Sequence, residues 1–284
     1  MSSGIIEYPY SSRLAPHIKN FVDSKRSSGF IYNTVARRLY AFDRWLREHP
    51  GFDTGELTKD IVSAWCVKRP TESFNSRNDR ANSVRNLAAD MIAMGHAAYV
   101  APVFRWHPCN PPYVPGFDEF ALFIRFVDNE YTEALLVTRR GRGQNSRKRL
   151  SSERLAIMLP VIFRMYFCTG MRVNEVTHLK VKNVNWDTGR ILIDKAKNDK
   201  HRFVFIPQEL LDLLKRCQEA LHGTGMFSEW LFPSTVTPER HIRGATVTKR
   251  FRDAWLKCYP DSEDEGKRPR VRELRNTFVV HRIT

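Results

Sequence analysis

A nearly unbroken apolar segment spans residues 155–168 and is followed by the sequence Thr169-Gly170-Met171-Arg172. The segment is too apolar for a surface helix, and it is too short and interrupted to span a bilayer. It therefore predicts a buried helix at the centre of a folded domain. Gly170 can adopt the backbone conformations that end a helix, and the residues after Arg172 repeat at helical spacing. We expect Arg172 to be held at the edge of a core, where its forked guanidinium suits a carboxylate or a phosphate.

The charge balance limits the class of partner. Lys and Arg number 46 against 31 Asp and Glu, which gives a formal net charge of +15 in 284 residues. A balance this basic favours a polyanion, most simply nucleic acid, over an ordinary basic soluble protein. The five cysteines are scattered, so we expect no disulfide framework and no zinc site. No secretion signal or apolar stretch of about 18 residues is present, so we expect a cytoplasmic protein without a membrane span.

Periodicity and proline content divide the chain into segments. Residues 1–12 have no periodicity and predict a flexible leader. Residues 13–100 carry four segments with helical spacing and predict a small helical domain. Five prolines between residues 101 and 116 predict a semi-rigid linker to a second domain over 117–284. That domain combines helices with a hairpin of two short strands at 190–194 and 202–206, so the predicted fold is mainly α with a small β-sheet.

Basic side chains recur where they would suit a nucleic acid. On the helix expected over 30–48, Asn33, Arg37, Tyr40 and Arg44 form a polar stripe that fits a DNA groove, although an ordinary solvated face fits equally well. An arm over residues 139–149 is expected to become ordered on phosphates, with a solvated loop as the alternative. The further cations that we expect to contact DNA are Arg77, Arg80, Arg85, Arg147, Lys148, Lys200, Lys249 and Arg250.

Three separated motifs resemble, in order and spacing, the catalytic boxes of tyrosine recombinases of the phage integrase type; they lie at residues 169–175, 197–207 and 273–278. The resemblance covers residues 13–284. It implies a clamp on duplex DNA, made of a helical, SAM-like core-binding domain and a mixed α/β catalytic domain. It also implies that a tyrosine attacks the scissile phosphate to leave a 3′-phosphotyrosine, with no metal or other cofactor, within a homotetramer on DNA.

The resemblance assigns roles to individual residues. Arg172 and Arg275 would hold the phosphate oxygens, because two permanently charged forks stabilise the charge of the transition state. A structural salt bridge to Glu175 or another acid is the alternative for Arg275. Lys197, on the hairpin, would protonate the leaving oxygen if its cationic neighbours lower its pKa, and Lys200 is its rival. We expect Glu175 to support the local structure.

Two departures from the family pattern stand out. Arg272 occupies a position where the family usually has histidine, and an arginine can donate a hydrogen bond but cannot act as a base near neutrality. No tyrosine follows Arg275, and Tyr259, the nearest before it, fits a packing role better than an attacking one. We therefore expect a catalytic domain that lacks its nucleophile, and a monomer that binds DNA without cleaving it. The alternatives are a non-catalytic DNA-binding regulator of a related recombinase and a topoisomerase-like relaxing enzyme.

Overall fold

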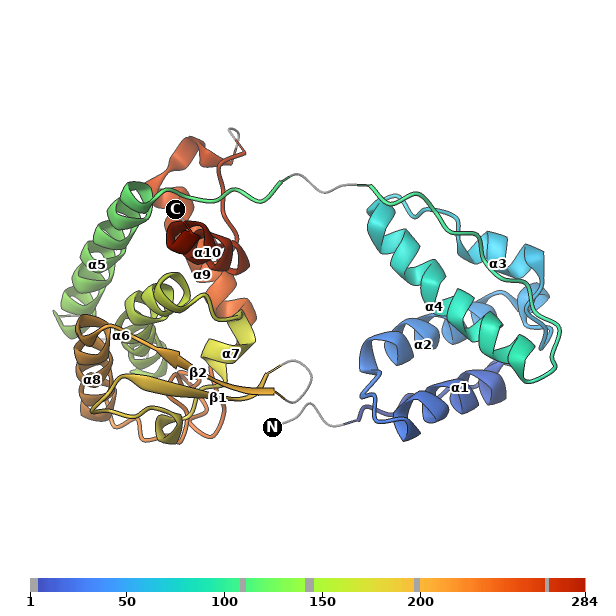
Figure 1. Cartoon of the computed structure of the whole chain (residues 1–284), viewed down its shortest axis with the longest axis horizontal. Helices are drawn as coiled ribbons and strands as arrows, with labels where there is room; N and C mark the ends of the chain where they lie inside the picture. The colour runs from blue at the N-terminus through green and yellow to red at the C-terminus, as the bar shows by residue number, and fades with distance from the viewer. Residues whose placement is uncertain (1–4, 108–110, 141–145, 197–199, 264–265, 284) are drawn as a thin grey trace. The chain divides into compact units, whose positions relative to one another are not determined.

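A computed structural model describes residues 5–107, 111–140, 146–196, 200–263 and 266–283. The chain forms two compact units, Met1–Asn110 and Pro111–Thr284 (Figure 1). Each unit has a hydrophobic core of its own. The structure is mainly helical with one two-stranded sheet in its described part, which confirms the predicted fold class. The boundary between the units falls inside the segment that the sequence predicts to be a linker.

Over residues 5–107, the first unit is built from four α-helices: α1 (Ala15–Ser27), α2 (Asn33–Glu48), α3 (Lys59–Trp65) and α4 (Phe74–Ala93). The hydroxyl groups of Thr58 and Ser73 accept hydrogen bonds from the backbone N–H groups of the first turns of α3 and α4, so each marks a helix start. A short 3₁₀ turn, η1 (Pro50–Phe52), follows α2. The apolar faces predicted from periodicity meet in the core of this unit, where Leu39 and Leu87 are fully buried.

Residues 5–12 pack against α2, so the prediction of a flexible leader is wrong for this segment. Asp43 is fully buried, and it accepts hydrogen bonds from the backbone N–H groups of Ser11 and Ser12 and from the Ser12 hydroxyl. The Tyr8 ring stacks on that of Tyr40, with 5.2 Å between the ring centroids. A buried carboxylate requires such donors, and the leader supplies them.

The first half of the predicted linker also belongs to the first unit. Ala101 is 2% exposed and lies in the core of this unit. The Arg85 guanidinium donates to the backbone oxygens of Ala101 and Pro102, while the side-chain amide of Asn75 pairs with the backbone of His107. A proline-rich segment has backbone oxygens that no regular ladder pairs, and the side chains of α4 satisfy them.

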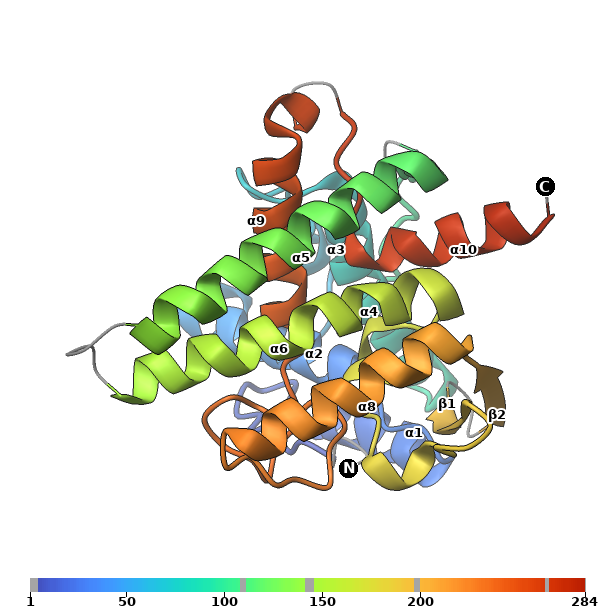
Figure 2. The ribbon, with the colours of Figure 1, turned by 90° about the vertical axis from the view of Figure 1, so that its left-hand side faces the viewer.

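In the second unit, α6 (Ser146–Thr169) lies between α5 (Phe117–Arg140) and α8 (Gln208–Gly223), as Figure 2 shows. Strands β1 (Arg190–Ala196) and β2 (Lys200–Phe205) pair antiparallel, with Leu192 opposite Phe203. The remaining helices are α7 (Val173–Thr177), α9 (Gly244–Cys258) and α10 (Leu274–Ile283). Three short 3₁₀ turns complete the unit: η2 (Val181–Asn183), η3 (Pro260–Ser262) and η4 (Val271–Glu273).

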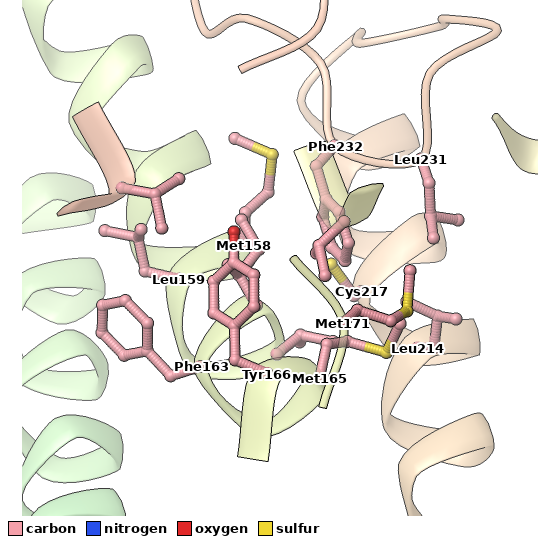
Figure 3. Close-up of a cluster of buried hydrophobic side chains, with 14 of the residues drawn as sticks. Met158, Leu159, Phe163, Met165, Tyr166, Met171, Leu214, Cys217, Leu231 and Phe232 are labelled. Atoms are coloured by element: carbon pink, nitrogen blue, oxygen red, sulfur yellow. The ribbon is translucent and has the colours of Figure 1, made fainter. Parts of the chain in front are cut away.

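Helix α6 forms the centre of this core, as its apolar sequence predicts. Leu159, Phe163 and Met165 are fully buried. The Phe163 ring packs against Phe123 of α5 and Phe251 of the later helix at 244–258, whereas Met165 lies on the side of Leu214 of α8 (Figure 3). Each such side chain contributes roughly 1.5–3 kcal/mol when it leaves water. None of the described helices combines the length and hydropathy needed to cross a bilayer. The rigid end of α6 is the base on which the candidate site stands.

Candidate functional site

Arg172 lies in the turn between α6 and α7, and its backbone is fixed from several sides. Gly170 has a φ of 59°, in the left-handed region, which lets the chain leave α6 and turn at once into α7. Arg172 is the residue that precedes the first turn of α7. The hydroxyl of the buried Tyr166 donates to the backbone oxygen of Val173, at 3.3 Å. The arginine is therefore held at the edge of the core, as expected.

The carboxylate of Glu175 binds the turn together. Its Oε2 accepts from the backbone N–H of Arg172 at 2.7 Å, and its Oε1 accepts from Arg172 Nη1 at 2.8 Å. Arg202 on β2 donates to both oxygens, at 3.0 and 2.7 Å. Burial by itself raises the pKa of Glu175, but the hydrogen bonds from these two arginines outweigh burial and lower that pKa from 4.5 to about 2. Glu175 is therefore an anion at neutral pH that supports the turn.

The Arg172 guanidinium remains accessible in spite of this contact. Its side chain is 47% exposed. Among the residues that the structure describes, Glu175 is its only hydrogen-bonding partner, and it receives one of the guanidinium N–H groups. The other N–H groups can donate to an anion such as a phosphate.

Arg275 lies on α10, which packs against α6 at the same turn. The Phe278 ring touches Gly170 so closely that a Cβ at this glycine would lie 2.5 Å from Phe278 Cδ1. Arg275 precedes Phe278 by one helical turn, so it lies on the same face of α10. The contact therefore brings Arg275 towards Arg172. No ion pair of Arg275 exists within the described ranges, and the second cation on Glu175 is Arg202, so the alternative of an Arg275–Glu175 salt bridge is not observed.

Arg272 lies in η4, immediately before α10, with its side chain 70% exposed. Its Nε is 3.9 Å from Oε1 of Glu273, whose side chain is 6% exposed. Glu273 also accepts from the backbone N–H of Arg270 at 2.7 Å. Arg272 therefore presents an exposed guanidinium about one turn before Arg275, which is partly buried.

The predicted general acid cannot be placed. Lys197 lies outside the described residues, between the end of β1 and the start of β2. Lys200, its rival, begins β2 opposite Ala196, and its side chain also lies outside the described part. Both assignments stay predictions.

Apart from Lys200, whose side chain lies outside the described part, the predicted DNA contacts fall into two groups, of which the first is exposed. Nε of Arg44 lies 3.3 Å from Oε1 of Glu48, and the two exposed side chains form an ion pair. Exposed side chains such as these can reach a phosphate, so their DNA contacts stay predictions. This group consists of Arg37, Arg44, Arg147, Lys148, Lys249 and Arg250.

The second group holds the first unit together instead, which corrects the prediction for Arg80 and gives internal partners to Arg77 and Arg85. Arg80 is 7% exposed and pairs with Glu72 at 2.7 Å. Arg77 donates to the backbone oxygen of Cys66, and its guanidinium lies 3.8 Å from the centre of the Phe104 ring. Arg85 donates to the segment at 101–102. A sequence does not show whether an arginine on a helix donates its hydrogen bonds to water or to a backbone carbonyl oxygen.

The polar stripe on α2 is partly covered as well. The side-chain oxygen of Asn33 accepts from the backbone N–H of Ile6, and Tyr8 stacks on Tyr40. The prediction that Asn33 and Tyr40 lie along a DNA groove is therefore corrected, because the chain's own leader occupies both. Arg37 and Arg44 remain on the exposed face of the stripe.

Arg202 is the site residue that sequence reasoning missed. Alternation in β2 gives no sequence signal for it, because the apolar Phe203 and Phe205 would be expected to face inward, whereas the structure exposes them. Side chains alternate along a strand, so Arg202 shares its face with Val204 and points inward. An inward arginine requires an acid, and Glu175 in the neighbouring motif is that acid.

Tyr166 and Tyr259 are the tyrosines that most closely precede the two arginine motifs in the sequence, and protein partners accept a hydrogen bond from both hydroxyl groups. Tyr166 is 1% exposed, and burial raises the pKa of its hydroxyl. Tyr259 donates its hydroxyl to the backbone oxygen of Glu119 at 2.8 Å and packs its ring on Trp255. Burial is also the main reason that the pKa of Tyr259 rises to about 12. Neither hydroxyl is presented to the guanidinium groups, and Tyr259 has a packing role.

The central buried helix, the hairpin, the Arg172 turn and helix α10 all lie in the second unit. Residues 144–283 match the model of the phage integrase family. The second unit of the chain, which contains this region, belongs to this family. The matched region contains Arg172, Glu175, Arg202 and Arg275.

Curated relatives agree over shorter segments. A probable integrase/recombinase protein of Methanocaldococcus jannaschii is 28% identical over 134 residues, which is 47% of this chain and 37% of that protein. The tyrosine recombinase XerC of Lactobacillus delbrueckii subsp. bulgaricus is 33% identical over 78 residues, or 28% of this chain and 26% of that protein. The matches thus cover 26% to 37% of the relatives' own length.

Solved structures share the fold. The XerH site-specific recombinase bound to its difH substrate aligns with a TM-score of 0.64 at 15% identity, over 99% of this chain and 90% of that one. A lambda integrase tetramer bound to a Holliday junction aligns with a TM-score of 0.60 at 14% identity, over 93% of this chain and 71% of that one. At these identities the likeness establishes the architecture alone.

Proposed function

We propose that this chain is the DNA-binding and phosphate-positioning part of a site-specific DNA recombinase or integrase. The observation that supports the proposal is the packing of α10 on the Arg172 turn through Phe278 and Gly170, because Arg275 lies one helical turn before Phe278. Within the described residues, both guanidinium groups keep N–H groups that can still donate to a phosphate. Membership of the phage integrase family supports the same chemistry.

In this proposal the two arginines bind the scissile phosphodiester. Attack on phosphorus concentrates negative charge on the non-bridging oxygens, and guanidinium forks offer paired donors to them without changing protonation. Arg272 adds a further donor, although it cannot accept a proton. Lys197 would protonate the leaving 5′ oxygen, and a tyrosine would form the 3′-phosphotyrosine. The placement of Tyr166 and Tyr259 supports a role for this chain in binding and positioning without attack.

The proposed partner is duplex DNA. The net charge of +15 and the exposed cations on α2 and α9 supply phosphate contacts, so the affinity should fall steeply as salt rises. We further propose that the complete recombinase assembles as a homotetramer on its site, whereas this chain alone is a monomer. Light scattering without DNA tests this, and a tetramer would count against it.

Selection from a pool of random-sequence duplexes tests sequence-specific binding. We expect one sequence to be enriched, and Arg172→Ala and Arg275→Ala to weaken binding to it while the fold is kept. If no sequence is enriched, site-specific recognition by this chain is wrong. A duplex with a nick next to the selected site then tests attack. We expect no covalent protein–DNA product on denaturing electrophoresis, and such a product would show that a tyrosine of this chain reacts.

A non-catalytic regulator is the second candidate, and Arg272 is the observation that favours it. An arginine in place of the family's usual histidine removes a group that can accept a proton near neutrality. A regulator of this kind would occupy a recombination site and hold it inactive. Adding this chain to a relative that carries its tyrosine distinguishes the two roles. Inhibition of strand cleavage at a shared site supports the regulator, and cleavage by mixed assemblies supports the recombinase.

A further inference from the structure

The carboxylate of Glu175 is saturated with donors. Its two oxygens offer about four acceptor positions. Four N–H groups fill them: two from Arg202, one from the Arg172 side chain and one from the Arg172 backbone. The Glu175 side chain is 9% exposed, so water has little access to these positions.

The two arginines hold this carboxylate in different ways. Arg202 uses both terminal nitrogens, one on each oxygen, which is the paired geometry that guanidinium and carboxylate groups favour. Arg172 reaches only Oε1 with its side chain and leaves its remaining N–H groups outward. Two positive charges therefore share one negative charge, and Arg172 has the looser share.

We propose that Arg202 is a positioning residue that keeps Arg172 open for an incoming phosphate by occupying Glu175. Without Arg202, the acceptor positions that it fills on Glu175 would become free, and the nearest cation is Arg172. Glu175 would then hold Arg172 by both oxygens and withdraw the N–H groups that an anion needs. The part of the proposal that names a phosphate rests on the proposed function, whereas the competition for Glu175 does not.

The surrounding structure makes this competition effective. Arg202 is fixed on β2, on the face that points inward, and its side chain is 35% exposed. The hydrogen bonds that Arg202 donates to Glu175 also raise the pKa of Arg202, so its charge is permanent. Arg172 is fixed on the opposite side by the turn at Gly170. Neither backbone has to move for Glu175 to change its preferred partner.

The reaction of arginine side chains with phenylglyoxal, read residue by residue by mass spectrometry, tests the proposal on the whole chain without DNA. In Arg202→Gln we expect Arg172 to react more slowly, by about fivefold, the order of effect of one accessible ion pair. Arg190→Gln is the matched control, because Arg190 lies on the same hairpin, stacks on Phe203 and does not touch Glu175. We expect it to leave the reactivity of Arg172 unchanged.

A double variant separates positioning from general loosening. In Arg202→Gln combined with Glu175→Gln, the charge that captures Arg172 is gone, so its reactivity should return to the wild-type rate or exceed it. A purely structural role for Arg202 predicts the opposite of the single-variant result, namely faster or unchanged reaction of Arg172. Either of those outcomes in Arg202→Gln would overturn the proposal.

The buried Arg154 reports whether the second unit stays folded. It is 9% exposed and donates to the backbone oxygens of Thr224 and Thr235, so it should remain unreactive in every variant. If Arg154 becomes reactive in Arg202→Gln, then Arg202→Lys replaces that variant. A lysine keeps the charge but cannot hold both oxygens as a fork does, so we expect an intermediate slowing of Arg172. An unchanged rate in that variant would also overturn the proposal.

Binding of the selected duplex separates this proposal from the proposed function. If Arg202→Gln slows the modification of Arg172 and also weakens DNA binding, both are supported. If it slows the modification and DNA binding is unaffected, Arg202 still controls Arg172, and the proposed role of Arg172 at the DNA phosphate is wrong.

Discussion

Replacing Gly170 with alanine tests the contact that gathers the two arginines. Two costs add at this position. The φ of 59° is in the left-handed region, which costs an L-residue roughly 1–2 kcal/mol. The new Cβ would also lie 2.5 Å from Phe278 Cδ1, with two further ring atoms at 3.1 and 3.2 Å, so the ring must move. Overpacking of this kind typically costs about 1–3 kcal/mol, so the sum is roughly 2–5 kcal/mol of unfolding free energy.

Gly225→Ala is the matched control for the backbone cost alone. Gly225 lies in the same unit with a φ of 72°, and its Cβ would meet no atom within 4 Å. We therefore expect Gly225→Ala to lose roughly 1–2 kcal/mol. Urea unfolding of the wild type and both variants, with comparison of midpoints at constant slope, measures the difference. An excess loss in Gly170→Ala of about 1–3 kcal/mol is the cost of the contact with α10.

The Phe278→Ala background decides whether the excess comes from that ring. There the cost of Gly170→Ala should shrink to the cost of Gly225→Ala, because the obstructing atoms are gone. Equal losses for both glycines in the wild-type background, or additive effects of Gly170→Ala and Phe278→Ala, would refute the docking of α10 on this turn. Helix α10 would then not direct Arg275 towards the Arg172 turn.

Three further predictions follow from ion pairs and exposed cations. The pKa of Glu175 is lowered from 4.5 to about 2. Its ionised form therefore contributes roughly 2–3 kcal/mol to the free energy of unfolding above about pH 4.5, and this contribution is lost as the pH falls towards 2. Glu175→Gln should flatten this part of the pH profile of stability, measured by urea unfolding. Arg80→Met should destabilise the first unit by about 3–5 kcal/mol, because it leaves Glu72 unpaired. Arg38→Met, which breaks the accessible ion pair with Asp79, should cost at most about 1 kcal/mol. Equal costs of the two variants in calorimetry would contradict the buried role of Arg80. Lys249→Gln removes one cation from α9, so the plot of log DNA affinity against log salt concentration should lose the slope of about one phosphate contact. An unchanged slope in anisotropy titrations at several salt concentrations would exclude Lys249 from the DNA interface.

Local patterns were sufficient for the main elements. The apolar run at residues 155–168 predicted a buried helix, and α6 is that helix. Amphipathic spacing predicted the helices of the first unit, and alternation predicted the hairpin, because these signals arise within one or two turns or a few strand residues. Two family motifs also located Arg172 and Arg275 on elements that meet at Gly170.

The remaining features depend on contacts between distant residues. Arg202 and Glu175 are separated by 27 positions, and Ser12 and Asp43 by 31. No local pattern shows which charge is removed from water, so Arg80 resembled an exposed cation and residues 5–12 resembled a loose tail. Sequence reasoning places a charge on an element, whereas tertiary packing decides whether the charge meets solvent or a partner.

The docking of residues 5–12 has a consequence for the way the first unit tolerates shortening. Asp43 is fully buried and depends on donors from Ser11 and Ser12. Removing residues 5–12 would take away these donors and leave Arg47, whose Nε is 3.6 Å from Oδ2, as the remaining described partner of the carboxylate. A buried charge that loses its hydrogen-bond donors costs several kcal/mol. Removing these residues would therefore destabilise the first unit as a mutation in its core does. The stability of α2 depends on residues 5–12 as well as on the helix itself.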